Sequence, residues 1–196
     1  MSKFNEIRSH FLIPFKELGE IVYNDGGTAE YGHAPAVAEQ AYMVTIFSPL
    51  NKEELTNLET KLKSSIPEQY RDFLCNGSNG LILFCGYFSL YGYVKKLDRR
   101  IGAIPQPFPL DIPNLYERPA NSKSSYLFIG GYRYDGSKLY IDTSTGKVHY
   151  SKRNDATSLY CWDSFDEMIE SEIPRIISLF DKSGEVIGSA SETLPI

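Results

Sequence analysis

The stretch of sequence that decides the fold reads Ser65-Ile66-Pro67-Glu68-Gln69-Tyr70-Arg71-Asp72-Phe73-Leu74, and Asn79-Gly80 follows it. Pro67 suits the first turn of a helix, where its missing N–H costs little. We expect Ser65 to cap this helix and Glu68 to complete a capping box. The side facing the core would consist of Ile66, Tyr70, Phe73 and Leu74. Residues 76–80 are rich in Asn and Gly, which predicts a helix end with a left-handed cap.

The residues before this stretch predict a helix, a loop, a strand and a second helix. Residues 4–18 carry apolar side chains at spacings of three and four, and Pro14 should kink or split that helix. Residues 25–35 open with Asp-Gly-Gly, which indicates a loop. Residues 41–47 form a short apolar run typical of a strand. Asn51 is the expected N-cap of the next helix, because a glutamate stands three residues on.

The residues after this stretch change to strand patterns and end in a helix. Short apolar runs predict strands at 81–84, 87–91, 126–129 and 158–162. We expect a hairpin where residues 139–142 and 147–150 flank a four-residue turn that ends in glycine. Asp163 or Ser164 can cap the last helix, and Pro174 should distort it.

The order of elements predicts the fold class. Helices come first, hairpin-linked strands follow and a helix closes the chain, which indicates an α+β fold with a mostly antiparallel sheet. The 196 residues suit a single domain over 1–196. The proline-rich segment 92–125 has no strong pattern and is either functional or mobile. The Gly/Ser-rich tail 183–196 is expected to be flexible, although Val186 and Ile187 could add a short edge strand.

Composition excludes several classes of partner and site. The net charge of -5 argues against nucleic-acid binding, and it would serve either a basic partner or solubility. No run reaches the roughly 18–20 apolar residues of a membrane span, and the N-terminus lacks an apolar signal core. Cys75, Cys85 and Cys161 lie in apolar runs without CxxC spacing, which predicts buried free thiols in a reducing compartment. We therefore expect a cytoplasmic protein.

Motifs for catalysis and metal binding are missing from the sequence. The histidines His10, His33 and His149 lie apart from one another, and no pair has metal-ligand spacing. No GxSxG, GxGxxG or Walker loop is present. Asp142 begins a turn, and the remaining positions of a calcium loop are not filled. We expect no catalytic residue, no metal and no cofactor, and we interpret the chain as a non-enzyme.

The Ile-Pro-x-x-Tyr-x-x-Phe-Leu helix with its Asn-Gly turn resembles the signature of the SUKH superfamily. Later segments that resemble the same family are 88–91, 128–131, 139–150 and 163–169. The resemblance covers about residues 50–178. It leaves an N-terminal extension, 1–49, and the 92–125 insertion outside the shared core.

The resemblance implies an α+β fold in which a twisted sheet carries helices. Bacterial members resemble immunity proteins that bind and neutralise toxins, and fungal members regulate cell-wall glucan synthesis and signalling. Neither role needs catalytic residues. The first hypothesis is therefore a cytoplasmic immunity protein whose partner is a toxin domain. A regulatory scaffold is the second hypothesis, and an enzyme with an unrecognised site is the third.

Tyrosines and one tryptophan are the candidate partner contacts, because such side chains dominate binding hot spots. The candidate set is Tyr91, Tyr93, Tyr132, Tyr134, Asp135 and Trp162. For the tyrosines the alternative is that they cover the edge of the sheet. For Trp162 the alternative is a hydrophobic staple at the start of the last helix.

Overall fold

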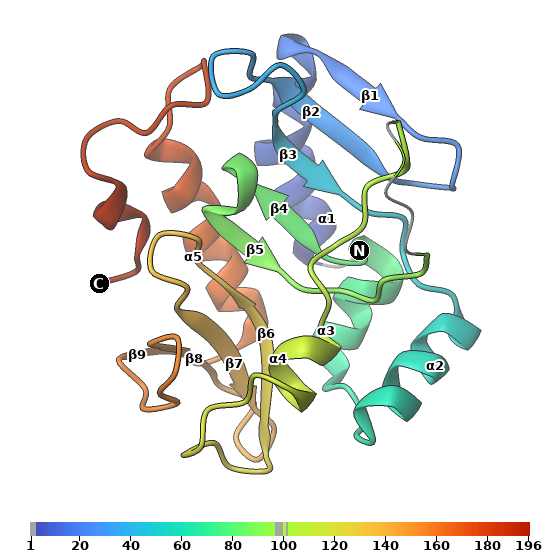
Figure 1. Cartoon of the computed structure of the whole chain (residues 1–196), viewed down its shortest axis with the longest axis vertical. Helices are drawn as coiled ribbons and strands as arrows, with labels where there is room; N and C mark the ends of the chain where they lie inside the picture. The colour runs from blue at the N-terminus through green and yellow to red at the C-terminus, as the bar shows by residue number, and fades with distance from the viewer. Residues whose placement is uncertain (1–2, 97–99, 101) are drawn as a thin grey trace.

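An antiparallel sheet forms the centre of the molecule in the computed structural model, which describes residues 3–96, 100 and 102–196 (Figure 1). In this part of the chain it has nine strands in the order β1 to β9, and each strand pairs with the next one. The strands are β1 Glu20–Val22, β2 Ala29–His33, β3 Tyr42–Ile46, β4 Leu81–Leu83, β5 Phe88–Leu90, β6 Tyr126–Gly131, β7 Lys138–Asp142, β8 Val148–Ser151 and β9 Tyr160–Trp162. The predicted α+β class with an antiparallel sheet is confirmed.

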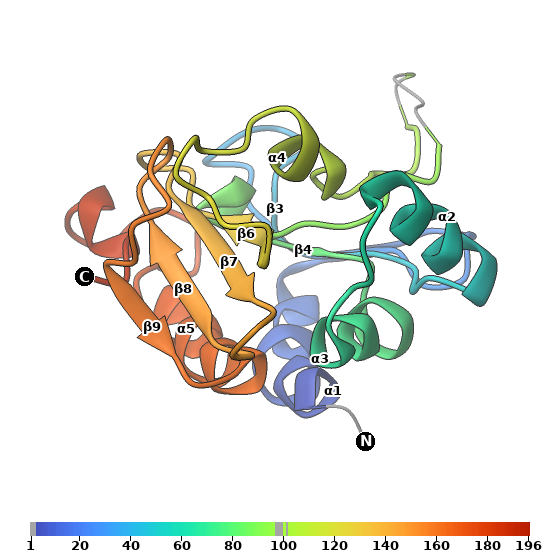
Figure 2. The same ribbon diagram turned by 90° about the horizontal axis from the view of Figure 1, so that it is seen from below.

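Helices cover the sheet unequally. The α-helices of the described residues are α1 Lys3–Ile7, α2 Lys52–Leu62, α3 Glu68–Asp72, α4 Asp111–Leu115 and α5 Phe165–Ser178. Figure 2 shows α1, α3 and α5 on one side of the twisted sheet and α4 on the other. With five residues, α4 is much shorter than α5, which has 14 and lies on the opposite side.

The fold-deciding stretch packs as predicted but begins its helix later. Tyr70 and Phe73 are buried and pack against Phe165 of α5 with ring centroids 5.2 and 5.4 Å apart. Ser65 is not the cap, because the helix starts after Pro67 without a side-chain cap. The N–H of Ile66 donates instead to Glu59 of α2 at 2.8 Å, and this bond holds the chain outside the helix before the proline.

The Asn-Gly turn connects the end of this helix to the sheet. A π-helical turn, Phe73–Gly77, ends at Ser78 in extended conformation, so the predicted left-handed cap is wrong. The Asn79 side chain bonds both backbone groups of Tyr93, at 2.7 Å each. Gly80 has a φ of +102°, which favours glycine. The pair therefore turns the chain into β4 and holds the segment that follows β5.

The first 49 residues contribute three strands to the same sheet. The helix predicted over 4–18 is split near Pro14, into α1, a π-helical turn Arg8–Leu12 and a 3-10 helix Ile13–Leu18. The loop predicted over 25–35 is confirmed for residues 25–28 and wrong for the rest of its middle part, because β2 occupies Ala29–His33. Pairing with β1 and β3 on its two sides forms this strand, and such pairing leaves no local pattern in the sequence.

The C-terminal part confirms the predicted hairpin and the last helix. Ser164 caps α5, and the helix continues through Pro174 to Ser178. The tail lies against α5, because Arg175 donates to the carbonyls of Glu192 and Thr193 at 2.8 Å each. In place of the short edge strand considered at Val186 and Ile187, Val186 forms an isolated antiparallel bridge with Phe180.

Cysteine burial differs from the prediction. Cys75 and Cys85 are half-buried and Cys161 is exposed, since Cys161 lies on the edge strand β9. The described residues contain no helix long and apolar enough to span a lipid bilayer. Residues 1–2 of the N-terminus and residues 97–99 and 101 of the 92–125 segment lie outside the described residues.

Candidate functional site

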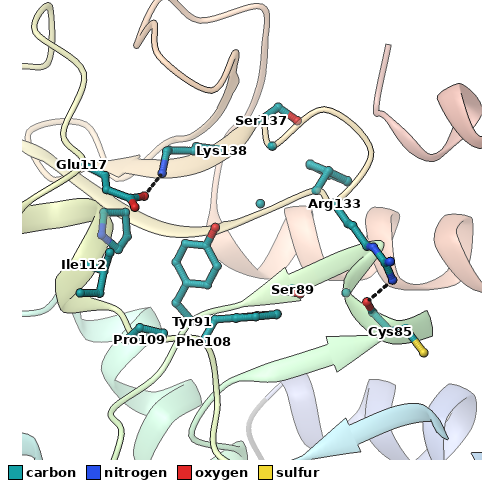
Figure 3. Close-up of a pocket in the computed structure, with 15 residues that line it drawn as sticks. Cys85, Ser89, Tyr91, Phe108, Pro109, Ile112, Glu117, Arg133, Ser137 and Lys138 are labelled. Atoms are coloured by element: carbon teal, nitrogen blue, oxygen red, sulfur yellow. Dashed lines mark hydrogen bonds and ion pairs between the residues drawn. The ribbon is translucent and has the colours of Figure 1, made fainter. Parts of the chain in front are cut away.

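A cavity of about 490 Å³ lies between the sheet and the segment that carries α4 (Figure 3). Its floor comes from β5, β6 and the start of β7, and its opposite wall from residues 108–117. The wall side chains are mostly apolar. The apolar wall side chains are Phe108, Pro109, Ile112 and Pro113, and Tyr91, next to β5, adds a ring from the sheet side. The volume falls within the range of about 300–1,000 Å³ that is usual for small-molecule sites.

Lys138 is a buried cation in this cavity. Its side chain is 7% exposed, and Nζ lies 3.5 Å from Glu117 Oε2, whereas Glu117 itself is 59% exposed. Charged N–H···O bonds are usually about 2.7–2.9 Å long. For comparison, Lys61 and Asp111 beside α4 lie 2.7 Å apart. Lys138 is therefore only loosely paired.

Tyr91 points its hydroxyl into the cavity, between Lys138 and Arg133 in Figure 3. Burial, and then the charge of Glu117, raise the pKa of Tyr91 to about 12. The phenol therefore stays protonated at neutral pH and can donate a hydrogen bond. Tyr91 and Phe108 meet edge to face, with their ring centroids 6.4 Å apart.

Ser89, Ser137 and Arg133 add further polar groups to the cavity. Ser89 is buried in β5, and its Oγ has no hydrogen-bond partner among the described residues. Arg133 lies at the mouth, where it donates to the Cys85 carbonyl at 3.1 Å and its guanidinium lies 5.9 Å from the Tyr87 ring centroid. The arrangement offers donors and a positive charge beside apolar rings.

The wall is fixed to the sheet by Asn114. The side chain of this buried residue donates to the carbonyls of Leu110 and Phe128 at 2.7 and 2.8 Å, and it accepts from the N–H of Phe128 at 2.9 Å. These bonds join α4 to β6. They position Ile112 and Pro113 over the cavity.

The structure brings together part of the predicted contact set. Tyr91 lines the cavity, and Tyr134 and Asp135 lie exposed in the β6–β7 turn, where Asp135 accepts from the N–H of Ser137 at 2.9 Å. Tyr93 is half-buried against the core.

Two members of the set belong to the core. Tyr132 and Trp162 are buried. The Tyr132 ring borders the cavity, but its hydroxyl bonds Glu172 of α5 at 2.7 Å. Trp162 is therefore not a surface anchor. It lies two residues before the cap of α5, in the region where we considered a hydrophobic staple.

The sequence did not point to Lys138, Glu117 or Phe108. A lysine at the start of a strand usually indicates a solvated position, and nothing near it in sequence shows that α4 covers it. The one available signal was the proline-rich segment 92–125, whose length predicted function or mobility. Residues 108–117 of that segment form the cavity wall.

Metal or nucleophile chemistry finds little support at this site. Within the part of the chain that the structure describes, no three His, Cys, Asp or Glu side chains are grouped as a metal site. Burial raises the pKa of the Cys85 thiol at the cavity, which disfavours the nucleophilic thiolate.

The comparisons with known proteins give the family. A search of curated proteins finds no match to this chain. Residues 49–171 match the SMI1 / KNR4 family (SUKH-1), which is more than half of the chain. The match includes the Ile-Pro helix, the cavity and the start of α5. The chain belongs to the SMI1 / KNR4 family (SUKH-1).

Proposed function

We propose that this chain is a non-catalytic protein-binding module, and specifically an immunity protein that neutralises a cognate toxin by direct binding in the cytoplasm. Membership of the family supports a binding role, and such a role was already the first hypothesis from the sequence. The observation that carries the proposal further is a group of exposed aromatic side chains on the two segments that contribute to the cavity, residues 108–117 and the β6–β7 turn.

These rim aromatics are Phe108, Tyr116 and Tyr134. They are 46%, 73% and 50% exposed, although large aromatic side chains usually lie in the core. Tyr116 lines a second hollow of about 400 Å³ that shares Glu117 and Lys138 with the cavity. Tyr134 lies in the β6–β7 turn beside Arg133, which borders the cavity mouth.

The rim has the composition of a binding hot spot. Tyr, Phe and Arg are enriched in protein interfaces, and few residues carry most of the binding energy. Arg133 and Arg153 add cations beside the rim aromatics. The toxin would therefore contact the face that carries α4 and the β6–β7 turn.

The test combines partner capture with a toxicity assay. Tagged protein is used to isolate its partner from the native host, and the partner is then expressed with and without this chain. We expect one dominant partner whose toxicity the wild-type chain relieves. Tyr116→Ala and Tyr134→Ala should weaken the complex by about tenfold or more each, since hot-spot truncations cost about 2 kcal/mol.

Tyr160→Ala is the matched control, because Tyr160 is an exposed tyrosine on β9 outside the rim. An equal loss of affinity in all three variants would show that the rim aromatics are not part of the interface. A set of several moderate cell-wall or signalling partners, none of them toxic, would replace this proposal with the regulatory-scaffold hypothesis. Turnover of a substrate by the purified chain would refute the non-catalytic role.

A further inference from the structure

The volume and lining of the cavity are not explained by protein binding at the rim aromatics. It is concave, about 490 Å³ in volume, and lined by rings and aliphatic side chains on the wall opposite β5 to β7. A flat partner surface would reach the rim aromatics but would not fill such a volume. A ligand that enters the cavity must match its apolar wall and its polar floor.

The charge of the lining is positive within an acidic chain. Lys138 and Arg133 line the cavity with one acid, Glu117, although the whole chain has a net charge of -5. Asp111 lies next to the wall residue Ile112, but it is already paired with Lys61 of α2 at 2.7 Å. An anion would therefore meet an unbalanced positive charge.

The ion pair of Lys138 is loose enough for its ammonium group to bind another anion. Its Nζ has three donors, and its ion-pair partner among the described residues, Glu117, lies 3.5 Å away and is mostly exposed. A buried charge that lacks close partners is costly. The exposed Glu117 can turn towards solvent when a better-placed anion enters.

The rest of the lining favours a carboxylate over a phosphate as the bound anion. Phosphate sites use several cations or a row of backbone N–H groups, and here a single buried cation lies among rings. Ser89 Oγ and the Tyr91 hydroxyl can supply one or two more donors. A singly charged group attached to an apolar body matches this set.

We infer that the cavity binds a small organic carboxylate, with its carboxylate on Lys138 and an apolar part of about the size of an aromatic ring against Tyr91, Phe108 and Ile112. This ligand site is additional to the protein-binding role and does not depend on it.

Matched acid and amide probes test the inference by isothermal titration calorimetry on the full chain. The probes are 3-phenylpropionate with 3-phenylpropionamide, and indole-3-acetate with indole-3-acetamide. We expect at least one acid to bind with one-to-one stoichiometry. Its amide should bind about tenfold more weakly, since hydrogen bonds to a charged group contribute about 1.5–3 kcal/mol.

Two variants locate the site. Lys138→Met keeps an apolar stem in the buried position and should weaken acid binding by about tenfold, to the level of the amide. Phe108→Ala should weaken the acid and the amide alike, and the chain should stay folded because Phe108 is half exposed. Lys152→Met, at an exposed lysine outside the cavity, is the control and should change neither affinity.

Three outcomes overturn the inference. In the first, no acid binds. In the second, acid and amide bind equally. In the third, acid binding survives both Lys138→Met and Phe108→Ala. If Lys138→Met fails to fold, the affinity of both probes for Phe108→Ala still decides between binding in this cavity, where both weaken, and binding elsewhere, where neither changes.

Discussion

Tyr132 donates a hydrogen bond from its hydroxyl to Oε2 of Glu172 at 2.7 Å, and this bond joins the end of β6 to α5 inside the core. Arg175 binds both oxygens of the same carboxylate, at 2.9 and 2.7 Å. Because Arg175 also bonds the carbonyls of Glu192 and Thr193, one buried carboxylate connects the sheet, the last helix and the tail.

Tyr132→Phe should destabilise the fold by about 2 kcal/mol, because a hydrogen bond to a charged, buried acceptor contributes about 1.5–3 kcal/mol. Urea denaturation measures the change in the free energy of unfolding. Tyr134→Phe is the control, since that side chain is half exposed and should change stability by less than about 0.5 kcal/mol. Equal stability of Tyr132→Phe and wild type would show that Arg175 alone satisfies Glu172.

Alkaline pH should unfold the protein through its buried tyrosines. Burial raises the pKa of Tyr70 well above its usual value, and burial followed by the charge of Glu172 does the same for Tyr132. Above about pH 10 the unfolded chain therefore loses protons that the folded chain keeps, and stability falls as pH rises. Each such tyrosine contributes a slope of about 1.4 kcal/mol per pH unit.

Denaturation midpoints between about pH 9 and 11.5 measure this slope in wild type, Tyr70→Phe and Tyr134→Phe. Tyr70→Phe should flatten the slope by about 1.4 kcal/mol per pH unit. Tyr134→Phe, at an exposed tyrosine, should leave the slope as it is. A slope that Tyr70→Phe does not alter would contradict the raised pKa.

Gly80→Ala should be more disruptive than a glycine substitution in an open turn. At Gly80 a Cβ would lie 2.8 Å from Cβ of Pro107 and 2.9 Å from the Leu90 carbonyl, and φ is +102°. At Gly146 φ is also positive, but no atom lies within 4 Å of the added Cβ. We expect losses of about 3 and 1 kcal/mol respectively. Thermal denaturation of the two variants separates backbone strain from steric conflict, and equal losses would mean that Pro107 moves aside.

Local sequence patterns were sufficient to predict much of the fold. Asn51 and Glu54 form the predicted capping box, with both bonds at 2.9 Å. The hairpin of β7 and β8 has the predicted four-residue turn between paired strands. These elements depend on neighbours in sequence. The strand β2 contains Gly32 and depends on pairing with β1 and β3, so no periodic pattern of its own marks it.

The candidate site was harder to predict than the fold. The turn that carries Tyr134 and Asp135 follows from local chemistry, because Asp-Gly favours turns. The burial of Lys138 depends on residues 108–117, which come from a distant part of the sequence. Likewise, Tyr132 is buried because α5 supplies Glu172 as its partner, forty positions along the chain. Composition alone could not separate this core tyrosine from the exposed Tyr134.

Asn114→Ala should release α4 from the sheet. The side chain makes three hydrogen bonds, to the backbones of Leu110 and Phe128. Their loss should cost about 3 kcal/mol and weaken carboxylate binding, because Ile112 would no longer be held over the cavity. Urea denaturation and amide hydrogen exchange of residues 111–116 measure the two effects. Asn57→Ala, at an exposed position of α2, is the control, and fast exchange confined to 111–116 is the expected signature.

Glu117→Gln should strengthen carboxylate binding by about two- to fivefold, because it removes the anion that competes for Lys138. It should also lower the pKa of Tyr91 below about 12, since the charge of Glu117 helps to raise it. Burial is the larger cause, so this pKa should stay above the usual tyrosine value of about 10. Calorimetry with 3-phenylpropionate measures the first effect, and the pH dependence of the Tyr91 ring signals in nuclear magnetic resonance spectra measures the second.

Asp135→Asn is the matched control, because Asp135 is an exposed carboxylate in the neighbouring turn and does not line the cavity. It should leave the affinity unchanged. Weaker acid binding in Glu117→Gln would mean that Glu117 positions Lys138 for its ligand. Unchanged acid binding together with a lowered pKa of Tyr91 would mean that the carboxylate of the ligand does not reach Lys138. The ligand site would then lie nearer the rim.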